Sequence, residues 1–269
     1  MPARPGPSRR SKRGPGPLRP SVILRRLARD RRSGASALAD QLLEALGSEW
    51  WGRSDRSTAE AELATVISEL PRAQPAMGAF LRWADQIRRK SASSSDPREW
   101  LPRWAKSTRT AVRAESSRLL RAGRRALPPR GVIVTLSRSS SVREVLTGTS
   151  LEQRPREVRV LVSRPGGEGK AQAADLRHAG LSVRLMDDRE AGEAIRGAGL
   201  VLLGADALLP NGDLVHKVGT RDLVRRARRR GVPVIALVSA SRRVRKLPPS
   251  WRLPRLFDRT PASWFRVVG

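Results

Sequence analysis

Three polar segments of the sequence carry residues that could bind or transform a phosphorylated ligand. The first contains Ser137, Arg138 and Ser139, which follow the apolar run 132–136 and precede a helix expected to begin near Val142. Hydroxyl groups and free backbone N–H groups at the start of a helix, with an arginine beside them, are typical of a phosphate-binding loop. Serines in this position are also common helix N-caps, so the segment by itself fits either role.

The second segment covers residues 163–169, is rich in glycine, and includes Arg164 and Glu168. Glycines let the backbone approach a ligand closely, and an arginine can bind a phosphate through two parallel hydrogen bonds. An ordinary turn between a strand and a helix explains the same residues equally well.

The third segment is the most informative. Asp206 follows the apolar run 200–203, where partial loss of water favours the protonated form of a carboxyl group and suits it to acid–base work. Lys217 offers a positive charge to a phosphate near the expected start of a helix. Its neighbours in the candidate site are His216, Gly219 and Thr220. The alternative role for Asp206 is to cap a turn, and its spacing alone favours that role.

The elements that must position these segments are strands of a parallel sheet. Beyond Pro128 and Gly131, short runs of Val, Ile and Leu recur without polar alternation, as in strands covered on both faces. The expected strands are residues 132–136, 158–162, 183–186, 200–203 and 234–238. Helix-like stretches at 171–179 and 221–230 each end before a glycine suited to a helix C-terminus. The pattern predicts an α/β fold with a doubly wound, Rossmann-like sheet over residues 128–269, whose ligands bind beyond the carboxyl ends of the strands.

The preceding part of the chain predicts a helical domain over residues 21–127. Leucines at helical spacing precede Gly47, a suitable end for their helix, and the apolar positions in 61–70 predict a short helix that ends at Pro71. Further helices are expected over residues 77–87 and 101–127. Residues 1–20 hold Pro, Gly, Ser and Arg with little to bury, which predicts a disordered basic tail.

Composition excludes several classes of chemistry. The 269 residues include no cysteine and two histidines, which excludes a disulfide scaffold, a thiolate metal site and a cysteine nucleophile. We therefore expect neither a metal nor a cofactor. No apolar run approaches the ~20 residues of a membrane-spanning helix, so we expect no membrane partner and a cytoplasmic location.

The net charge of +29 is concentrated at the two ends of the chain. Residues 1–32 carry +10 and residues 221–269 carry +12. The basic tail and the arginine-rich stretch 221–230 could bind RNA as a sequence-independent electrostatic surface. Arginine outnumbers lysine 48 to 6, as GC-rich coding DNA tends to produce, and the absence of tyrosine leaves few rings to stack on bases. Composition therefore does not require a nucleic-acid partner.

Three runs of sequence, taken together, resemble one known family. They are VIVTLSRSSSVREVL from Val132, VRVLVSRPGGEGKAQAADLRHAGLSVRLMDD from Val158, and LVLLGADALLPNGDLVHKVGTRDLVRRARRRGVPVIAL from Leu200. The combination of SRP-x-x-E-G with GAD-x-x-x-x-NG-x-x-x-x-K-x-GT resembles the alpha/beta/delta subunit family of eukaryotic initiation factor 2B. Its enzyme relatives are methylthioribose-1-phosphate isomerase and ribose-1,5-bisphosphate isomerase. The resemblance implies an N-terminal helical domain and a Rossmann-like C-terminal domain through which subunits pair, so we expect a homodimer or a higher oligomer.

The family's isomerases interconvert a 1-phosphorylated aldose and its ketose, using a cysteine after the first strand and the aspartate of the GAD motif. By this resemblance Asp206 matches the aspartate and Ser137 stands at the cysteine position, which makes them the candidate catalytic pair. A hydroxyl is much harder to ionise than a thiol, and no histidine base is evident beside Ser137. Three further positions depart from the family pattern: His216 replaces an asparagine, Glu168 a glutamine, and Gln74 an arginine.

These residues support three hypotheses. The first is a non-catalytic member of the family that binds a phosphosugar or a nucleotide and acts as a regulatory or assembly subunit. The second is an aldose–ketose isomerase of the methylthioribose-1-phosphate or ribose-1,5-bisphosphate type, with Asp206 as its acid–base group. The third is an RNA-associated basic protein. The missing thiol favours the first hypothesis and leaves open whether the chain is an enzyme.

Overall fold

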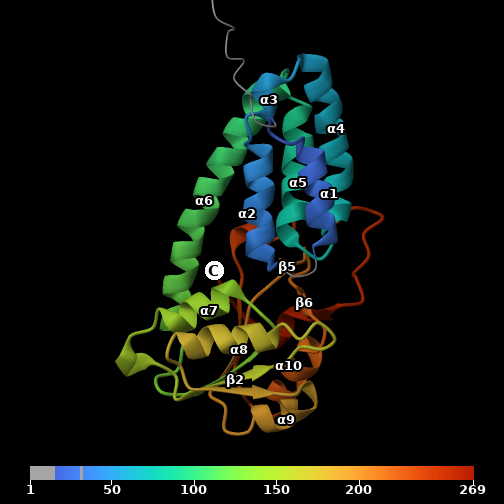
Figure 1. Cartoon of the computed structure of the whole chain (residues 1–269). Helices are drawn as coiled ribbons and strands as arrows, with labels where there is room; N and C mark the ends of the chain where they lie inside the picture. Colours follow the sequence, from blue (N-terminus) through green and yellow to red (C-terminus); the bar gives the residue numbers. More distant parts are fainter. Residues whose placement is uncertain (1–15, 31–32) are drawn as a thin grey trace, which may run out of the picture.

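The computed structural model describes residues 16–30 and 33–269, and Figure 1 shows a layer of helices standing on a sheet domain. Residues 1–15 of the predicted basic tail lie outside the described residues. Helix α1 (Pro20–Arg29) begins at the last position assigned to that tail, because a proline at the first helical position needs no hydrogen-bond partner and already has a helical φ. No helix in the described ranges is long and apolar enough to cross a membrane.

The N-terminal half is built from helices that share one apolar core. They are α1, α2 (Ala35–Leu46), α3 (Trp50–Arg53), α4 (Arg56–Ala73), α5 (Gly78–Ser91) and α6 (Pro97–Arg125). Trp51, Phe80 and Trp83 are fully enclosed in this core. The carboxylates of Asp55 and Asp96 accept hydrogen bonds from first-turn N–H groups of α4 and α6, so local sequence sets where these two helices begin.

Pro71 does not end its helix, contrary to the sequence-based expectation. Helix α4 is 18 residues long and continues through Pro71 to Ala73. A proline inside a helix removes one backbone hydrogen bond and crowds the preceding turn. Here the burial of Leu70 and Ala73 in the helical core holds the last turn in place. Gly47 ends α2 as expected.

The C-terminal half contains a six-stranded parallel sheet, which confirms the predicted doubly wound α/β class. Its strand order is β3 (Val183–Met186), β2 (Glu157–Leu161), β1 (Val132–Leu136), β4 (Leu200–Leu203), β7 (Val234–Leu237) and β9 (Arg266–Val268). The helices on one face are α7 (Ser140–Thr147), α8 (Gly169–His178) and the end of α6, and those on the other are α9 (Ala191–Ala194) and α10 (Thr220–Arg229). Burial on both faces explains the runs of Val, Ile and Leu.

A small antiparallel sheet lies outside the strands expected from the sequence. Its strands are β5 (Ala207–Leu208), β6 (Leu214–Lys217) and β8 (Phe257–Thr260). The pairing of β6 with β8 holds His216 in a buried position opposite Asp258. Strand β8 is distant from β6 in the sequence, so no local pattern indicates this pairing. Short 3-10 turns complete the chain: η1 (Leu151–Gln153), η2 (Asp188–Glu190), η3 (Ala240–Arg242) and η4 (Ala262–Trp264).

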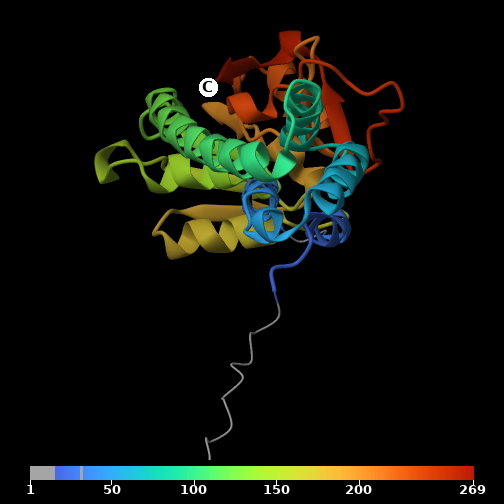
Figure 2. The same ribbon diagram turned by 90° about the horizontal axis from the view of Figure 1, so that it is seen from above.

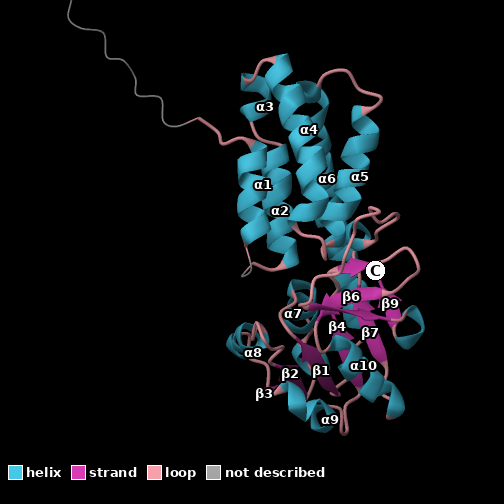
Figure 3. Ribbon diagram, turned by 90° about the vertical axis from the view of Figure 1, so that its right-hand side faces the viewer, coloured by secondary structure: helices cyan, strands magenta, loops and turns pink. Residues whose placement is uncertain are grey.

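The order of the parallel strands changes direction between β1 and β4. At such a switch point the loops after the two strands diverge and leave room for a ligand. These loops face the lower ends of α2 and α5 (Figure 3), where the N–H of Gly78 donates to the carbonyl oxygen of Asp206 at 2.8 Å. Seen from above, the helices lie over this part of the sheet (Figure 2).

Candidate functional site

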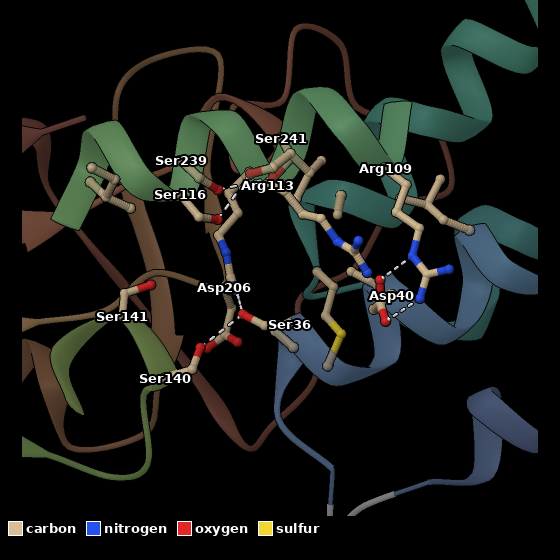
Figure 4. Close-up of a pocket in the computed structure, with 18 of the residues that line it drawn as sticks. Ser36, Asp40, Arg109, Arg113, Ser116, Ser140, Ser141, Asp206, Ser239 and Ser241 are labelled. Atoms are coloured by element: carbon tan, nitrogen blue, oxygen red, sulfur yellow. Dashed lines mark hydrogen bonds and ion pairs between the residues drawn. The ribbon is translucent and has the colours of Figure 1, made fainter. Parts of the chain in front are cut away.

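A cleft lies between the N-terminal helices and the loops that follow β1, β4 and β7. It consists of two adjoining hollows of about 130 and 320 Å³, whose walls share Ala35, Ser36, Ser140, Asp206 and Arg242. Figure 4 shows the smaller hollow, in which Ser36, Ser140 and Asp206 gather at one end. The cleft therefore occupies the switch point of the sheet, where doubly wound proteins bind their ligands.

Two helix N-termini meet at this cleft. Ser36 in the first turn of α2 and Ser140 at the start of α7 have hydroxyl oxygens 2.9 Å apart. Ser139 caps α7 by accepting a hydrogen bond from the N–H of Val142 at 3.3 Å. Helix α2, in contrast, begins after Gly34, which has no side chain to cap it. The first-turn N–H groups of α2 are therefore available to an anion in the cleft.

Arg242 is a positive charge of the cleft that sequence reasoning missed. It belongs to η3, and its guanidinium donates to the carbonyl oxygen of Ala205 and to Oγ of Ser36, the latter at 2.8 Å. Burial lowers the pKa of Arg242 while the charges of Asp206 and Glu115 raise it, and a guanidinium stays protonated in proteins. The sequence contains a signal for this role. Arg242 comes shortly after the buried strand β7, and the carboxyl ends of parallel strands meet at one edge of the sheet, where ligands bind.

The structure brings Arg138 and Ser139 to the larger hollow. Arg138 shares the carboxylate of Asp175 with Arg143, at N to O distances of 2.9 and 3.4 Å. Such partly exposed ion pairs contribute about 0–1 kcal/mol each. Either arginine can therefore leave Asp175 for an anionic ligand at little cost.

Asp206 lines both hollows, in keeping with its place after β4. Its backbone is held on both sides, because its N–H donates to the carbonyl oxygen of Val215 at 3.0 Å and its own carbonyl accepts from Gly78. Its side chain lies beside Ser36 and Ser140 in Figure 4. The carboxylate therefore lies within the cleft on a backbone that is held in place.

His216 lines the larger hollow from β6 and has 3% of its surface exposed. Its Nδ1 lies 3.0 Å from Oγ1 of Thr220, which in turn donates to the carbonyl oxygen of Lys217 at 2.7 Å. Burial lowers the pKa of His216, so the ring is neutral near pH 7. The charged groups that face it are Asp206 and Glu168, which raise its pKa, and Lys217 and Arg242, which lower it.

The structure places Ser137 and Arg164 outside the two hollows that Asp206 lines. Ser137 has a φ of 65° and is 1% exposed, and its Oγ has no hydrogen-bond partner among the described residues. Its side chain is enclosed in the protein and lines neither hollow. Arg164 is 65% exposed and pairs with Asp187 at 3.1 Å. Because β2 lies on the far side of β1 from β4, the loop that carries Arg164 is displaced from the switch point.

The residues expected to bind phosphate at the start of α10 contact other parts of the protein. The ammonium of Lys217 lies 2.8 Å from Oε1 of Glu168. The N–H groups of Gly219 and Arg221 donate to Oδ2 of Asp258 at 2.8 and 3.1 Å, so a carboxylate from β8 caps this helix. Neither hollow is lined by Glu168, Lys217, Gly219 or Thr220. Phosphate binding by these residues stays a prediction.

Gln74, which replaces the arginine of the family pattern, supports the backbone instead of the cleft. It is buried, and its Nε2 donates to the carbonyl oxygen of Leu27 at 2.7 Å. Across residues 16–30 and 33–269, no group of three or more His, Asp or Glu residues is placed to hold a metal ion.

The fold and the cleft define a doubly wound α/β protein with a helical layer over the carboxyl edge of its sheet. The initiation factor 2 subunit family matches residues 31–250, and the chain belongs to that family. An eIF-2B subunit 2-like protein from Pyrococcus horikoshii is 29% identical over 210 residues, which are 76% of this chain and 72% of that protein. A methylthioribose-1-phosphate isomerase from Roseiflexus castenholzii is 31% identical over 146 residues, or 50% of this chain and 41% of the enzyme.

Solved structures show the same architecture. The crystal structure of the translation initiation factor eIF-2B of Pyrococcus horikoshii matches with a TM-score of 0.82 at 25% identity and covers 94% of this chain and 95% of that one. The tetrameric eIF2B beta2-delta2 complex from C. thermophilum matches with a TM-score of 0.79 at 21% identity, with coverage of 93% and 90%. The family resemblance is confirmed, but one fold serves both isomerases and factor subunits, so activity depends on the site.

Proposed function

We propose that the chain is a non-catalytic member of its family that binds a small phosphorylated ligand in the cleft, either a phosphosugar or a nucleotide, and acts as a regulatory or assembly subunit. One observation carries the proposal. The uncapped start of α2 and the guanidinium of Arg242 meet in the cleft that Asp206 lines, whereas Ser137 is enclosed away from it.

The charged groups of the cleft favour one orientation of such a ligand. Phosphate oxygens accept hydrogen bonds, so the phosphate belongs at the first turn of α2 beside Arg242. The carboxylate of Asp206 repels a phosphate and suits hydroxyl groups, which can donate to it. Because Asp206 lies beside Ser36, a molecule that carries hydroxyl groups close to its phosphate fits this arrangement.

The isomerase alternative lacks the partner that the resemblance assigns to it. Proton transfer and covalent chemistry require the reacting groups to reach the substrate together. Asp206 lines the cleft, but the Oγ of Ser137 has no base beside it and no access to either hollow. The geometry therefore favours binding without turnover.

Calorimetric titration of the full chain with inorganic phosphate, α-D-ribose 1-phosphate and AMP tests the proposal. We expect saturable binding of at least one of the two organic phosphates, and stabilisation of about 2.7 kcal/mol at a hundred times its Kd. Phosphorus NMR of the same mixtures should show no conversion of the sugar phosphate. The absence of binding by all three compounds would contradict the proposal. Turnover that disappears in Asp206→Asn would establish the isomerase instead.

We also propose assembly into a homodimer or a higher oligomer through the C-terminal half. The tetrameric complex with the same fold supports this assignment. Light scattering after size-exclusion chromatography should give a mass of at least two chains at micromolar concentration. A monomer throughout the concentration range would contradict it.

The observations lend less support to RNA as a partner. Arg225 and Arg226 of α10 pair with Asp222, and Arg228 donates to the carbonyl oxygen of Ser263 at 2.6 Å. These contacts engage three arginines of α10 within the protein, and residues 1–15 of the basic tail lie outside the described ranges. RNA binding stays a prediction, and a steep fall of affinity with salt is its expected signature.

A further inference from the structure

A long groove lies on the opposite side of α6 from the cleft. It encloses about 780 Å³ between α5, α6 and η3. Its α6 wall consists of residues three or four apart, which form one helix face: Trp104, Thr108, Ala111, Glu115, Arg118 and Ala122. The cleft is lined instead by Arg109, Arg113 and Ser116 of the same helix. A helix face from Trp104 to Ala122 is about 27 Å long, so the groove suits an elongated partner better than a small molecule.

The middle of α6 is left uncovered by the rest of the protein. Helix α6 reaches from the helical layer to the sheet domain (Figure 1), and none of its residues 106–118 is buried. Trp83 of α5 and Leu119 are buried where they line the groove, and Trp104 is half-buried beside them. An apolar surface that the fold leaves open is typical of a site for another protein.

The rim of the groove carries positive charges that form no ion pairs. Arg82 of α5 and Arg118 of α6 line the groove, and neither forms an ion pair with another described residue. Arg82 also lines a small adjoining pocket with Arg245 and Lys246, which have no ion pair within 16–30 and 33–269 either. Burial and the nearby charge of Arg245 lower the pKa of Arg82. An anion placed here would therefore relieve the repulsion between these cations.

The carboxylates near these cations already have partners. Glu115 lines the groove, and its Oε1 accepts a hydrogen bond from the N–H of Ala240 in η3. Asp85 lines the adjoining pocket and pairs with Arg88 and Arg89. The groove and its adjoining pocket therefore keep a net positive charge.

We propose that this groove binds an acidic amphipathic helix of a partner protein, whose apolar side chains cover the floor and whose carboxylates reach Arg82 and Arg118. Docking of such a helix in an apolar groove is a recurrent mode of recognition, and Trp and Arg are enriched among the residues that carry most of the binding energy. A second copy of this chain is a poorer occupant, because its net charge of +29 opposes a basic groove. Nucleic acid is poorer too, because an apolar floor offers its phosphates no donors.

Fluorescence anisotropy of the full chain with two labelled synthetic helices of about 18 residues tests the charge and the shape together. The first peptide carries leucine at helical spacings of three and four, with glutamate and alanine elsewhere, and the second has lysine in place of each glutamate. We expect saturable binding of the glutamate peptide and at least about tenfold weaker binding of the lysine peptide. No binding of the glutamate peptide, or equal affinity for the two, overturns the proposal.

Two alanines of α6 provide a matched pair of variants. Ala111→Glu adds bulk and negative charge at the centre of the groove and should weaken the glutamate peptide at least about tenfold. Ala114→Glu alters an equally exposed position that lines neither the groove nor the cleft, so its affinity should stay at the wild-type value. Both variants should fold, because glutamate is a good helix former. Equal affinities in the two variants place the peptide elsewhere and overturn the proposal.

A second pair of variants tests the basic rim. Arg118→Gln should weaken the glutamate peptide several-fold and reduce the dependence of its affinity on salt. Arg121→Gln removes an exposed arginine of the same helix that lies outside the groove, and it should change neither quantity. Identical salt dependence in Arg118→Gln and the wild type contradicts the role of the rim.

The same proteins distinguish the other occupants. Light scattering should give Ala111→Glu the mass of the wild type, and a smaller mass would make the groove an interface between copies of this chain. Labelled oligouridylate should bind Ala111→Glu and Ala114→Glu equally, and its selective loss from Ala111→Glu would make the groove an RNA site. Either of these results overturns the proposal of an acidic helix.

Discussion

The N–H of Gly78 donates to the carbonyl oxygen of Asp206 at 2.8 Å, and the α-carbon of Gly78 rests against the backbone of Arg242. Gly78 is the first residue of α5, so this contact joins the helical layer to the loops after β4 and β7. The two halves meet here through backbone atoms. The spacing across the cleft is therefore set by groups that cannot change rotamer to relieve pressure.

Gly78→Ala should lower the free energy of unfolding by about 1–3 kcal/mol, the usual cost of overpacking. An added Cβ would collide with the carbonyl oxygen of Arg242 and lie 2.8 Å from its carbonyl carbon. Urea denaturation measures the change. Gly52→Ala in α3 is the matched control, because nothing lies within 4 Å of a Cβ there, and its free energy of unfolding should stay within about 1 kcal/mol of the wild type or rise. Equal losses in the two variants would show that the contact is unimportant.

Arg242→Gln should weaken the binding of inorganic phosphate about tenfold or more, because a charge-assisted hydrogen bond is replaced by a neutral one. The backbone N–H of residue 242 still donates to the carbonyl oxygen of Ser239, so the 3-10 turn should stay in place. Arg196→Gln removes a 72% exposed arginine outside the cleft and should leave the affinity unchanged. Calorimetry at two salt concentrations measures both variants. An Arg242→Gln protein that binds phosphate as tightly as the wild type would exclude Arg242 from the site.

Asp258→Ala should destabilise the protein by about 1 kcal/mol, the typical cost of losing a helix cap. The N–H groups of Gly219 and Arg221 then lose their shared acceptor at the start of α10. Asp258→Asn retains an acceptor oxygen and should recover most of the loss. Thermal unfolding of the three proteins provides the comparison. No difference between alanine and wild type would mean that water caps α10 as well as this carboxylate does.

His216 should make stability fall as the pH drops below about 6.5, the ordinary histidine pKa. Burial holds the pKa of His216 below that value in the folded protein, so the unfolded chain binds the proton first and folding loses free energy in this window. The groups that face the ring are Asp206, Glu168, Lys217 and Arg242. Urea denaturation from pH 7 to 5 should show a steeper loss for the wild type than for His216→Gln.

Glu115 also contributes to the pH dependence of stability, so the effect of His216 has to be measured as a difference between the wild type and His216→Gln. Burial raises the pKa of Glu115, so the folded protein holds that proton to a higher pH than the unfolded chain. Its contribution to stability therefore declines as the pH rises, opposite to that of His216. The difference between the two proteins cancels Glu115 and isolates His216. Parallel pH profiles would contradict the buried, neutral state of this histidine.

Local sequence predicted the parts of the fold that local physics controls. The apolar runs 132–136 and 200–203 are paired strands of the sheet. They contain no polar alternation because both of their faces are buried. Asp206, separated from one of these strands by Gly204 and Ala205, lines the cleft. Pro71 shows the limit of local rules, since packing of its neighbours outweighed the helix-breaking tendency of proline.

The remaining parts depended on partners far away in the chain. Residues 214–217 form a strand between residues 207–208 and 257–260, and these pairings place His216 at the larger hollow. Ser137 and Asp206 both follow strands of the switch point, yet Ser137 is enclosed while Asp206 lines the cleft. The difference depends on backbone conformation and the surrounding packing, which spacing does not record.

The sequence by itself determined the doubly wound class, because strands buried on both faces are apolar runs in the chain. It also determined the absence of a thiol, because a chain without cysteine has no thiol in any fold. Tertiary structure alone decided which polar groups share the cleft. Arg242, Ser36 and His216 come from three elements distant in the chain, and they meet because the strands, helices and small sheet pack as they do. A carboxylate or an imidazole acquires its role from the neighbours that packing brings to it.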